Sequence, residues 1–528
     1  MRLMFMTGVV VALCAQVCAQ LRADQVLVVY DSRRASERDV AEFYAGSAKV
    51  PGGAGNLPGV HPGVHVFNLQ TAGVAAASPG NISYADFITL IRDPIRNYLQ
   101  SQSLARQVRC IVLTKGMPHR IQDSDNAPVG DQPTNMFQEF LMGDANCASV
   151  DNELVLLWQN LGEGEAGGRG DSFSDGLILN PYHNASQPIG SYSNAHIQVA
   201  KPFVVYGSSL GKYWYVPDTE PIEHQLTPGD MYLVVRLDGH TVEDVQAMVN
   251  RAQGIMYDVN NAAFVFDEAD SNGIADATPN SELDNQTGPT RINDDFETAR
   301  DLLLADGRFD PSRVHYDALG GTGHWIVGPN VDYGGEGLLV PDSLILLSHY
   351  GSNHFNAPNG AGVSANDTFA ESFNYLPGAI FNTIESYNAR AFGPLGTRFN
   401  QEQVADFIAA GGTFGIGHCW EPFAYTVTDS EPLVRNFILG RMTWAEAAYT
   451  AIPALSWHYI VVGDPLARAS RSSEDIDGSG RVDIDDLYAW DQNPVDINRD
   501  GSANLLDRNL IEASVRGSVF EDQGGRER

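Results

Sequence analysis

Short apolar runs alternate with helix-like segments along most of this chain, and this alternation limits the possible fold more than any other feature. The runs are rich in β-branched residues and are too short for helices, so they predict strands. They cover residues 25–30, 64–67, 109–114, 232–236, 263–266, 344–347, 378–381 and 413–416. Strands separated by helices are typical of α/β proteins, so we expect a mainly parallel sheet with helices on both faces.

The expected helices cover residues 36–44, 87–104, 242–252 and 401–410. Ser36 is the expected N-cap of the first helix, because a serine hydroxyl can accept a free backbone N–H there. Pro94 should break or restart the second helix, because proline lacks the N–H that a helix interior needs. Gly411 and Gly412 suit the C-cap of the last helix. The α/β body should cover 25–468, with an irregular polar insertion near 121–200 that holds a short helix at 151–159.

The first 19 residues predict a signal peptide. Arg2 supplies a positive start, residues 6–17 are mostly apolar, and residues 17–19 resemble a small-residue cleavage site. We therefore expect a secreted protein. No later run reaches the roughly 18–20 apolar residues of a membrane helix, so no membrane span is expected.

The charge of the chain narrows the classes of partner. Its 528 residues include 66 acidic and 33 basic ones, which gives a formal net charge of −33. Such a field repels phosphate groups, so nucleic acid and anionic membrane surfaces are excluded as expected partners, whereas hard cations are favoured.

After removal of the signal peptide, only three cysteines would remain, Cys110, Cys147 and Cys419. At most one disulfide can form among them, so this is not a disulfide scaffold.

Two twelve-residue acidic loops, 475–486 and 496–507, follow the body. Each places oxygen-bearing side chains at positions 1, 3, 5, 9 and 12 and a glycine, Gly480 or Gly501, at position 6. Ca²⁺ prefers six to eight hard oxygen ligands, and the glycine permits the sharp turn that wraps them around one ion. The expected ligands are Asp475, Asp477, Ser479, the carbonyl of Arg481, Asp483 and Asp486 in the first loop, and Asp496, Asn498, Asp500, the carbonyl of Ser502, Asn504 and Asp507 in the second.

Apolar helix faces follow each loop, so the two loops predict a small all-α, EF-hand-like module over 475–515 that binds two Ca²⁺ ions. Residues 469–474 are polar and are expected to form a linker, and residues 516–528 a charged tail.

Residues 474–515 resemble a type I dockerin. The resemblance implies a calcium-folded module that docks onto a cohesin, often in assemblies that degrade polysaccharides. Such modules commonly carry Ser or Thr at loop positions 10 and 11, where this chain has Ile484-Asp485 and Leu505-Leu506. Calcium binding is therefore expected, whereas the partner stays open between a cohesin-like protein and another cell-surface protein.

The body resembles an uncharacterised exported bacterial family that occurs in species carrying exosortase. The resemblance covers roughly 25–468 and implies no known activity. Its motifs occur in one order and include Leu113–Pro118 with Arg120, Ser149–Leu154, Asn180–Tyr182, Arg236–Gly239, Gly351–Asn353, Pro377–Ile380, Glu421–Phe423, Ser456-Trp457 and Gly463–Leu466.

A more distant resemblance is to gingipain-like and caspase-like cysteine peptidases, in which a His follows one strand and the catalytic Cys follows the next. Here His349 follows the strand at 344–347, whereas the Cys position holds Ser386. Cys419, which follows the strand after that, is a second candidate nucleophile. Parallel strands place their carboxyl ends along one edge, so these three side chains are expected near one another.

Two interpretations of the body follow. The preferred one is a non-catalytic or degenerate peptidase-like domain that is tethered or assembled through the calcium module. The alternative is an active hydrolase, either a cysteine peptidase that uses His349 and Cys419 or a component of a polysaccharide-degrading assembly. Two further candidate sites are less favoured than the calcium loops. Lys115 is either a site residue or a surface lysine, and the surface lysine is preferred. The acidic stretch 267–276 either holds a third calcium ion or is a plain acidic loop, and the loop is preferred.

Overall fold

The computed structural model describes residues 20–53, 55–122, 148–159, 178–198, 226–267, 295–317, 324–330, 336–349, 369–393, 402–420, 422 and 427–518. The expected signal peptide, Cys147, most of the insertion and the end of the charged tail lie outside these residues, as does the acidic stretch after Asp267. Among the described residues, no helix is both long and apolar enough to cross a bilayer.

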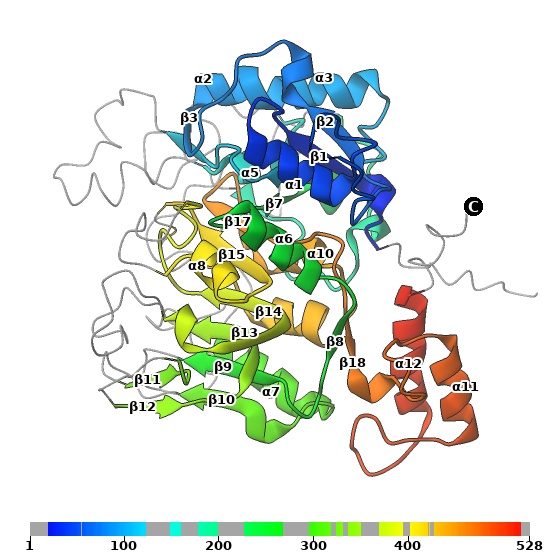
Figure 1. Ribbon diagram of the computed structural model, residues 1–528. Coiled ribbons are helices and arrows are strands. Elements are labelled where there is room, and N and C mark those ends of the chain that lie inside the picture. Colours follow the sequence, from blue (N-terminus) through cyan, green and yellow to red (C-terminus); the bar gives the residue numbers. More distant parts are fainter. Residues whose placement is uncertain are drawn as a thin grey trace, which may run out of the picture.

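A ten-stranded sheet forms the centre of the body (Figure 1). Its strands lie in the order β10 (Val314–Asp317), β9 (Ala263–Asp267), β13 (Ser343–His349), β14 (Asn374–Thr383), β15 (Phe414–His418), β17 (Tyr459–Val462), β7 (Leu233–Leu237), β4 (Cys110–Thr114), β1 (Val26–Tyr30) and β2 (His65–Asn68). The strands from β10 to β15 are parallel to their neighbours, as are those from β7 to β2. Between the two groups, β17 runs antiparallel to β15 and pairs with β7 through Val462 and Arg236. The expected α/β class and mainly parallel sheet are confirmed.

Helices cover both faces of the sheet, as adjacent residues of β13 illustrate. Ser348 shares a hydrogen bond with Ser430, which directly precedes one group of helices on one face of the sheet. The next residue, His349, contacts Glu402, which lies beside a second group of helices. Successive side chains of a strand point to opposite faces, so the two groups lie on opposite sides. One group holds α1 (Ala35–Ala45), α6 (Val242–Arg251) and α8 (Val404–Ala409), and the other holds α7 (Asp295–Asp306), α9 (Glu431–Leu433) and α10 (Trp444–Ala451).

The expected helix at 87–104 consists of several pieces. A short helix, α2 (Tyr84–Asp86), leads into a π-helical turn, Phe87–Arg92, and then into α3 (Asp93–Ser101). Pro94 lies in the first turn of α3, so the predicted restart at this proline is confirmed. In the insertion, the short helix is α5 (Val150–Val155).

Ser36 is not the N-cap of α1, which corrects the prediction. The helix begins at Ala35 after Arg34, whose backbone is extended and whose side chain makes no cap. The hydroxyl of Ser36 instead faces the carbonyl of Lys115, 3.4 Å away. The carboxylate of Glu37 accepts hydrogen bonds from the Asp31 N–H and the Arg34 side chain, which ties this end of the helix to the end of β1.

Residues 469–474, expected to be a linker, are structured. They form β18 (Ala469–Arg471), which pairs with β8 (Ile255–Tyr257), and a 3₁₀ turn, Ser472–Glu474. Three further two-stranded pairs are β11 (His324–Val327) with β12 (Glu336–Leu339), β16 (Ala454–Leu455) with β6 (Ile178–Leu179), and β3 (Asn81–Ser83) with β5 (Arg120–Gln122).

Two helices complete the described chain, α11 (Ile484–Gln492) and α12 (Leu505–Ser518), each of which follows one acidic loop. They share a small apolar core that is separate from the core of the body. Its buried members are Val482, Leu487, Trp490, Ile497, Ile511 and Val515. Figure 1 shows these helices, in orange and red, beside β8 and β18.

Candidate functional site

The first acidic loop is folded around its own carboxylates. One Asp475 oxygen accepts the N–H of Ser479 at 3.0 Å, and the other accepts the N–H of Gly480 at 2.9 Å. Asp477 also accepts the Ser479 N–H, at 2.9 Å, and this bond lowers the pKa of Asp477. Gly480 has φ +82°, a conformation that L side chains rarely adopt, so glycine is needed at this turn.

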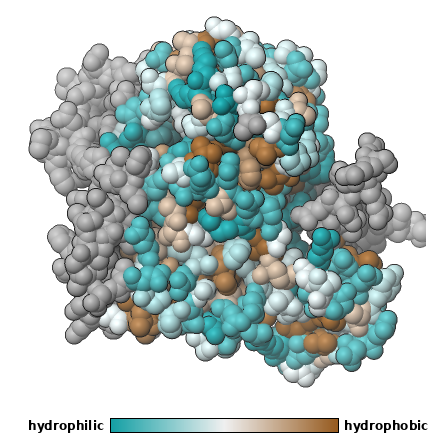
Figure 2. All heavy atoms as spheres, viewed as in Figure 1, coloured by the Kyte–Doolittle hydropathy of each residue, from teal (hydrophilic) through white to brown (hydrophobic). Residues whose placement is uncertain are grey.

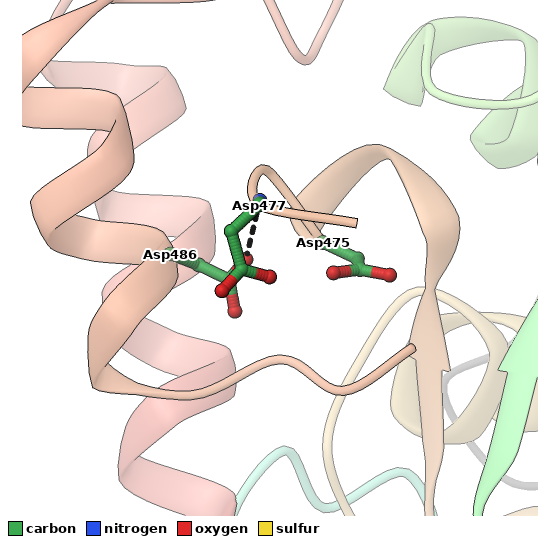
Figure 3. Close-up of side chains that lie close together, drawn as sticks. All are labelled: Asp475, Asp477 and Asp486. Carbon is green, nitrogen blue, oxygen red and sulfur yellow. Dashed lines mark hydrogen bonds between the residues drawn. The ribbon is translucent and has the colours of Figure 1, made fainter. Parts of the chain in front are cut away.

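Asp486, in the first turn of α11, closes the loop from the other side. Its carboxylate accepts the N–H groups of Ile476 at 2.6 Å and Asp477 at 3.2 Å, and with its second oxygen that of Asp483 at 2.7 Å. Asp475, Asp477 and Asp486 each place a carboxylate oxygen within 4.8 Å of the other two (Figure 3). Oxygens on opposite sides of one Ca²⁺ lie about 4.8 Å apart, twice the usual ligand distance of about 2.4 Å, so this spacing fits one ion.

The second loop repeats the backbone hydrogen bonds that the carboxylates at positions 1 and 12 accept in the first loop. Asp496 accepts the N–H groups of Asp500 at 3.2 Å and Gly501 at 2.8 Å, and Gly501 has φ +92°. Asp507 accepts three backbone N–H groups, as Asp486 does, and they belong to Ile497, Asn498 and Asn504. Two loops of different sequence therefore share the same backbone hydrogen bonds to the carboxylates at positions 1 and 12.

The remaining expected ligands lie in the same loops. The position-7 carbonyls of Arg481 and Ser502 accept hydrogen bonds from the side chains of Ser479 and Asn504, respectively. Asp483 accepts the N–H of Asp485 and is the N-cap of α11. In EF-hand loops this position often reaches the ion through water. The oxygen-only donor set thus suits a hard cation.

The catalytic candidates follow three neighbouring strands. His349 ends β13, Ser386 follows β14, and Cys419 follows β15. The register pairs His349 with Thr383, and Asn382 with Ile416, so the three strands are adjacent and parallel. The structure thus places the three residues at the same edge of this part of the sheet.

His349 is fully buried against a carboxylate. Its Nε2 lies 2.6 Å from Oε2 of Glu402, which is also buried, and its ring packs edge-on against Phe369 at 4.7 Å. Burial lowers the pKa of His349 to about 3. Glu402 could not be predicted as the partner of His349, because it lies 53 residues away in the chain and follows no recognisable motif.

The surroundings of Cys419 do not favour a nucleophilic thiol. Its side chain is fully buried, and its N–H donates to the carbonyl of His458. Burial raises the pKa of the thiol far above its ordinary value, whereas a nucleophilic cysteine needs a lowered one. Ser386 is partly exposed and follows the buried Glu385, whose carboxylate accepts the N–H of Glu402 at 3.3 Å.

We predict that Cys419 does not react with thiol reagents in the native protein at neutral pH. Iodoacetamide labelling followed by peptide mapping should leave Cys419 unmodified until denaturant is added. Cys110 is equally buried, and burial raises the pKa of its thiol too, so it provides an internal control. Selective labelling of Cys419 in the folded protein, lost in His349→Ala, would instead favour a cysteine peptidase.

Lys115 is a structural residue and not a surface lysine, which corrects that expectation. Its ammonium lies 3.3 Å from Asp238 and donates to the carbonyls of Gly239 and Phe392, the latter at 3.1 Å. The turn after β4 is thereby joined to the segment that follows β14.

A buried ion pair lies beside Lys115. Arg236 donates to both oxygens of Asp151, at 2.6 and 3.1 Å, and to the carbonyls of Met117 and Pro118. Its charge is thus compensated and its donors are used, as a buried arginine requires. These residues belong to the motifs on which the resemblance to the exported bacterial family rests. Their contacts give those motifs a role in packing.

The Gly-Asp-Pro motif also has a role in packing, through the side chain of Asp464. This buried carboxylate lies 2.7 Å from both the Tyr44 hydroxyl and Nε2 of His61, and accepts from Gln253 at 2.8 Å. Burial alone would raise the pKa of Asp464, but His61, Tyr44 and Gln253 lower it below 3.8. Because the folded-state pKa is depressed, the stabilisation is present above the unfolded pKa and is lost as the pH falls through the folded one.

We expect Asp464→Asn to lower the free energy of unfolding by about 3 kcal/mol at pH 7, since it removes one partner of a buried charged network. Urea unfolding at several pH values should show the difference from wild type shrinking below pH 3.8. Asp39→Asn, at a partly exposed pair with Arg38, is the matched control. A difference that does not shrink at any pH below 3.8 would contradict this prediction.

No protein-family model matches this chain, and comparisons with curated proteins and with solved structures find no significant match.

Proposed function

We propose that this protein is an exported calcium-binding protein whose two C-terminal loops, 475–486 and 496–507, each bind one Ca²⁺. The observation that carries this proposal is the repeated loop geometry. Carboxylates at positions 1 and 12 accept hydrogen bonds from equivalent N–H groups in both loops, and the position-6 glycines have the same left-handed conformation. An acidic turn that arose for solubility alone has no reason to repeat these details.

Isothermal titration calorimetry of the full chain with CaCl₂ tests the proposal. We expect two ions per chain and weaker binding of Mg²⁺, which prefers strict octahedral geometry and keeps its water. A chain that binds no Ca²⁺ would refute the proposal.

The body is proposed to be a peptidase-like domain that does not catalyse hydrolysis. Support for the peptidase-like part comes from the adjacent parallel strands β13, which ends at His349, and β14, which is followed by Ser386. Support for the absence of catalysis comes from the buried, protonated thiol of Cys419 and from the contact between His349 and Glu402. The Cys419 labelling described above separates this interpretation from a cysteine peptidase.

The calcium loops are also proposed to form a dockerin-like module that meets a protein partner, either cohesin-like or another cell-surface protein. The residues at the recognition positions support this idea, because Ile484, Leu505 and Leu506 are 48%, 70% and 60% exposed. Tyr488 of α11 is exposed as well. Figure 2 shows hydrophobic surface on this part of the molecule, at the lower right. Apolar side chains there favour a partner with an apolar face over one that recognises Ser or Thr.

A further inference from the structure

A buried charged cluster joins the calcium loops to the body. Its centre is Glu474, the residue before the first calcium ligand, and it is fully buried. Its carboxylate lies 2.6 Å from Arg308, 3.1 Å from Arg471 and 3.3 Å from Arg441, and it accepts the hydroxyl of Ser514. We call these five residues the Glu474 cluster.

The members of the Glu474 cluster come from distant parts of the chain. Arg308 follows α7 of the body, Arg441 precedes α10, and Arg471 lies in β18. Ser514 lies in α12, and Arg441 also donates to the α12 carbonyl of Leu510 at 2.8 Å. Helix α12 is therefore held by charged groups of the body, in the place where the sequence predicted a linker.

The second calcium loop touches the body directly. Arg499 donates to Oδ1 of Asn260 at 2.7 Å. The carbonyl of Asn498, at ligand position 3, lies so close to Gly307 that a Cβ there would be 2.2 Å from it. Met256 of β8 packs against the apolar core that α11 and α12 share. Loop, helix and core thus all rest on one surface, formed by β8, β18 and the end of α7.

We propose that the calcium loops and the body form one calcium-dependent folding unit, in which Ca²⁺ binding stabilises the part of the body around β8, β18 and Arg441. This inference rests on the proposed calcium sites. If the loops served only as a tether, Ca²⁺ binding to them would leave the stability of the body unchanged.

The physical link runs through helix α12. Acidic groups crowd each loop, and without a cation their mutual repulsion opposes the closed loop. Asp507 belongs both to the second loop and to the first turn of α12, so opening the loop removes the start of the helix. Loss of α12 would take Ser514 and Leu510 away from Glu474 and Arg441. Because coupling free energies are reciprocal, contacts in the body must in turn strengthen Ca²⁺ binding.

Hydrogen exchange of the full chain, read by mass spectrometry with 2 mM EGTA or with saturating CaCl₂, tests the inference. We expect Ca²⁺ to slow exchange about tenfold in residues 255–257, 438–441 and 469–471, a typical coupling between sites. Residues 26–30 of β1, near the β2 edge of the sheet, are the internal comparison and should slow by a smaller factor, because Ca²⁺ affects them only through global unfolding. Equal slowing in β1 and in the three segments would overturn the local coupling.

Ser514→Ala provides the matched perturbation, since it removes one hydroxyl from the Glu474 cluster and keeps a good helix former. It should reduce the calcium effect in the body segments at least about threefold while calorimetry still detects two ions. Ser101→Ala, at an exposed site in α3, is the control. Protection confined to 475–518 despite measured Ca²⁺ binding would overturn the inference and leave the proposed function intact. A chain without Ca²⁺ binding would refute both.

Discussion

Replacing Asp475 and Asp496 together with asparagine should lower the calcium affinity of the full chain at least about 100-fold at both sites. Each residue holds position 1 of its loop, and each carboxylate uses both oxygens to hold the turn at positions 5 and 6. Substitution would thus remove a proposed charged ligand and part of the loop geometry. Loss of a mere supporting contact costs metal sites about 10–100-fold, so loss of a ligand should cost more. Isothermal titration calorimetry gives the affinity.

Asp491→Asn is the control for this result. Asp491 carries the same charge within the same segment, but it lies on α11, outside both loops, where it pairs with Arg508. Its replacement should change the affinity less than about threefold, because surface charges are well screened. If Asp491→Asn weakened binding as much as the loop substitutions do, the ions would be held by general negative charge and not by the loops.

The second large effect is expected at Glu474. Burial alone would raise the pKa of this carboxyl, but Arg471, Arg441 and Arg308 hold it at about 2, so it is ionised at neutral pH. Glu474→Ala would leave these buried guanidinium groups without their shared partner. Removing one member of a buried ion pair costs about 3–5 kcal/mol, and we expect a loss of this size in the free energy of unfolding. Urea unfolding followed by circular dichroism measures it.

Glu512→Ala is the comparison for Glu474→Ala. Glu512 lies on α12 and makes a partly exposed pair with Arg508, so its replacement should cost less than about 1 kcal/mol. Equal costs for the two variants would mean that the Glu474 cluster contributes little, and that α12 is held by its apolar face alone.

Most strands could be predicted from the sequence, because a strand that is buried on both faces requires an apolar run. Residues 26–30, 110–114 and 263–267 are buried throughout and were visible as such runs. The acidic loops were equally visible, because the oxygen-bearing side chains of one loop lie within twelve residues. Both features are local in sequence, and local patterns are what a single sequence records.

The contacts that the sequence did not reveal are those between distant residues. The segment 469–474 looked like a linker because it is polar, yet its charges are matched by Arg308 and Arg441, far away in the chain. Likewise, His349 suggested a catalytic dyad, and only the fold brought Glu402 to its ring. A polar segment is exposed only when its charged residues have no buried partner. A single sequence does not show such partners when they are distant in the chain.

The positions of calcium ions in a crystal are the sharpest test of the two proposed calcium sites. Crystals of the full chain grown with CaCl₂, measured at a wavelength where calcium scatters anomalously, would show the ions without reference to any assumed ligand. We expect two anomalous peaks, one about 2.4 Å from oxygens of Asp475, Asp477 and Asp486, and one at the same distance from Asp496 and Asp507. Crystals that contain ordered loops but no peak at either position would contradict this expectation.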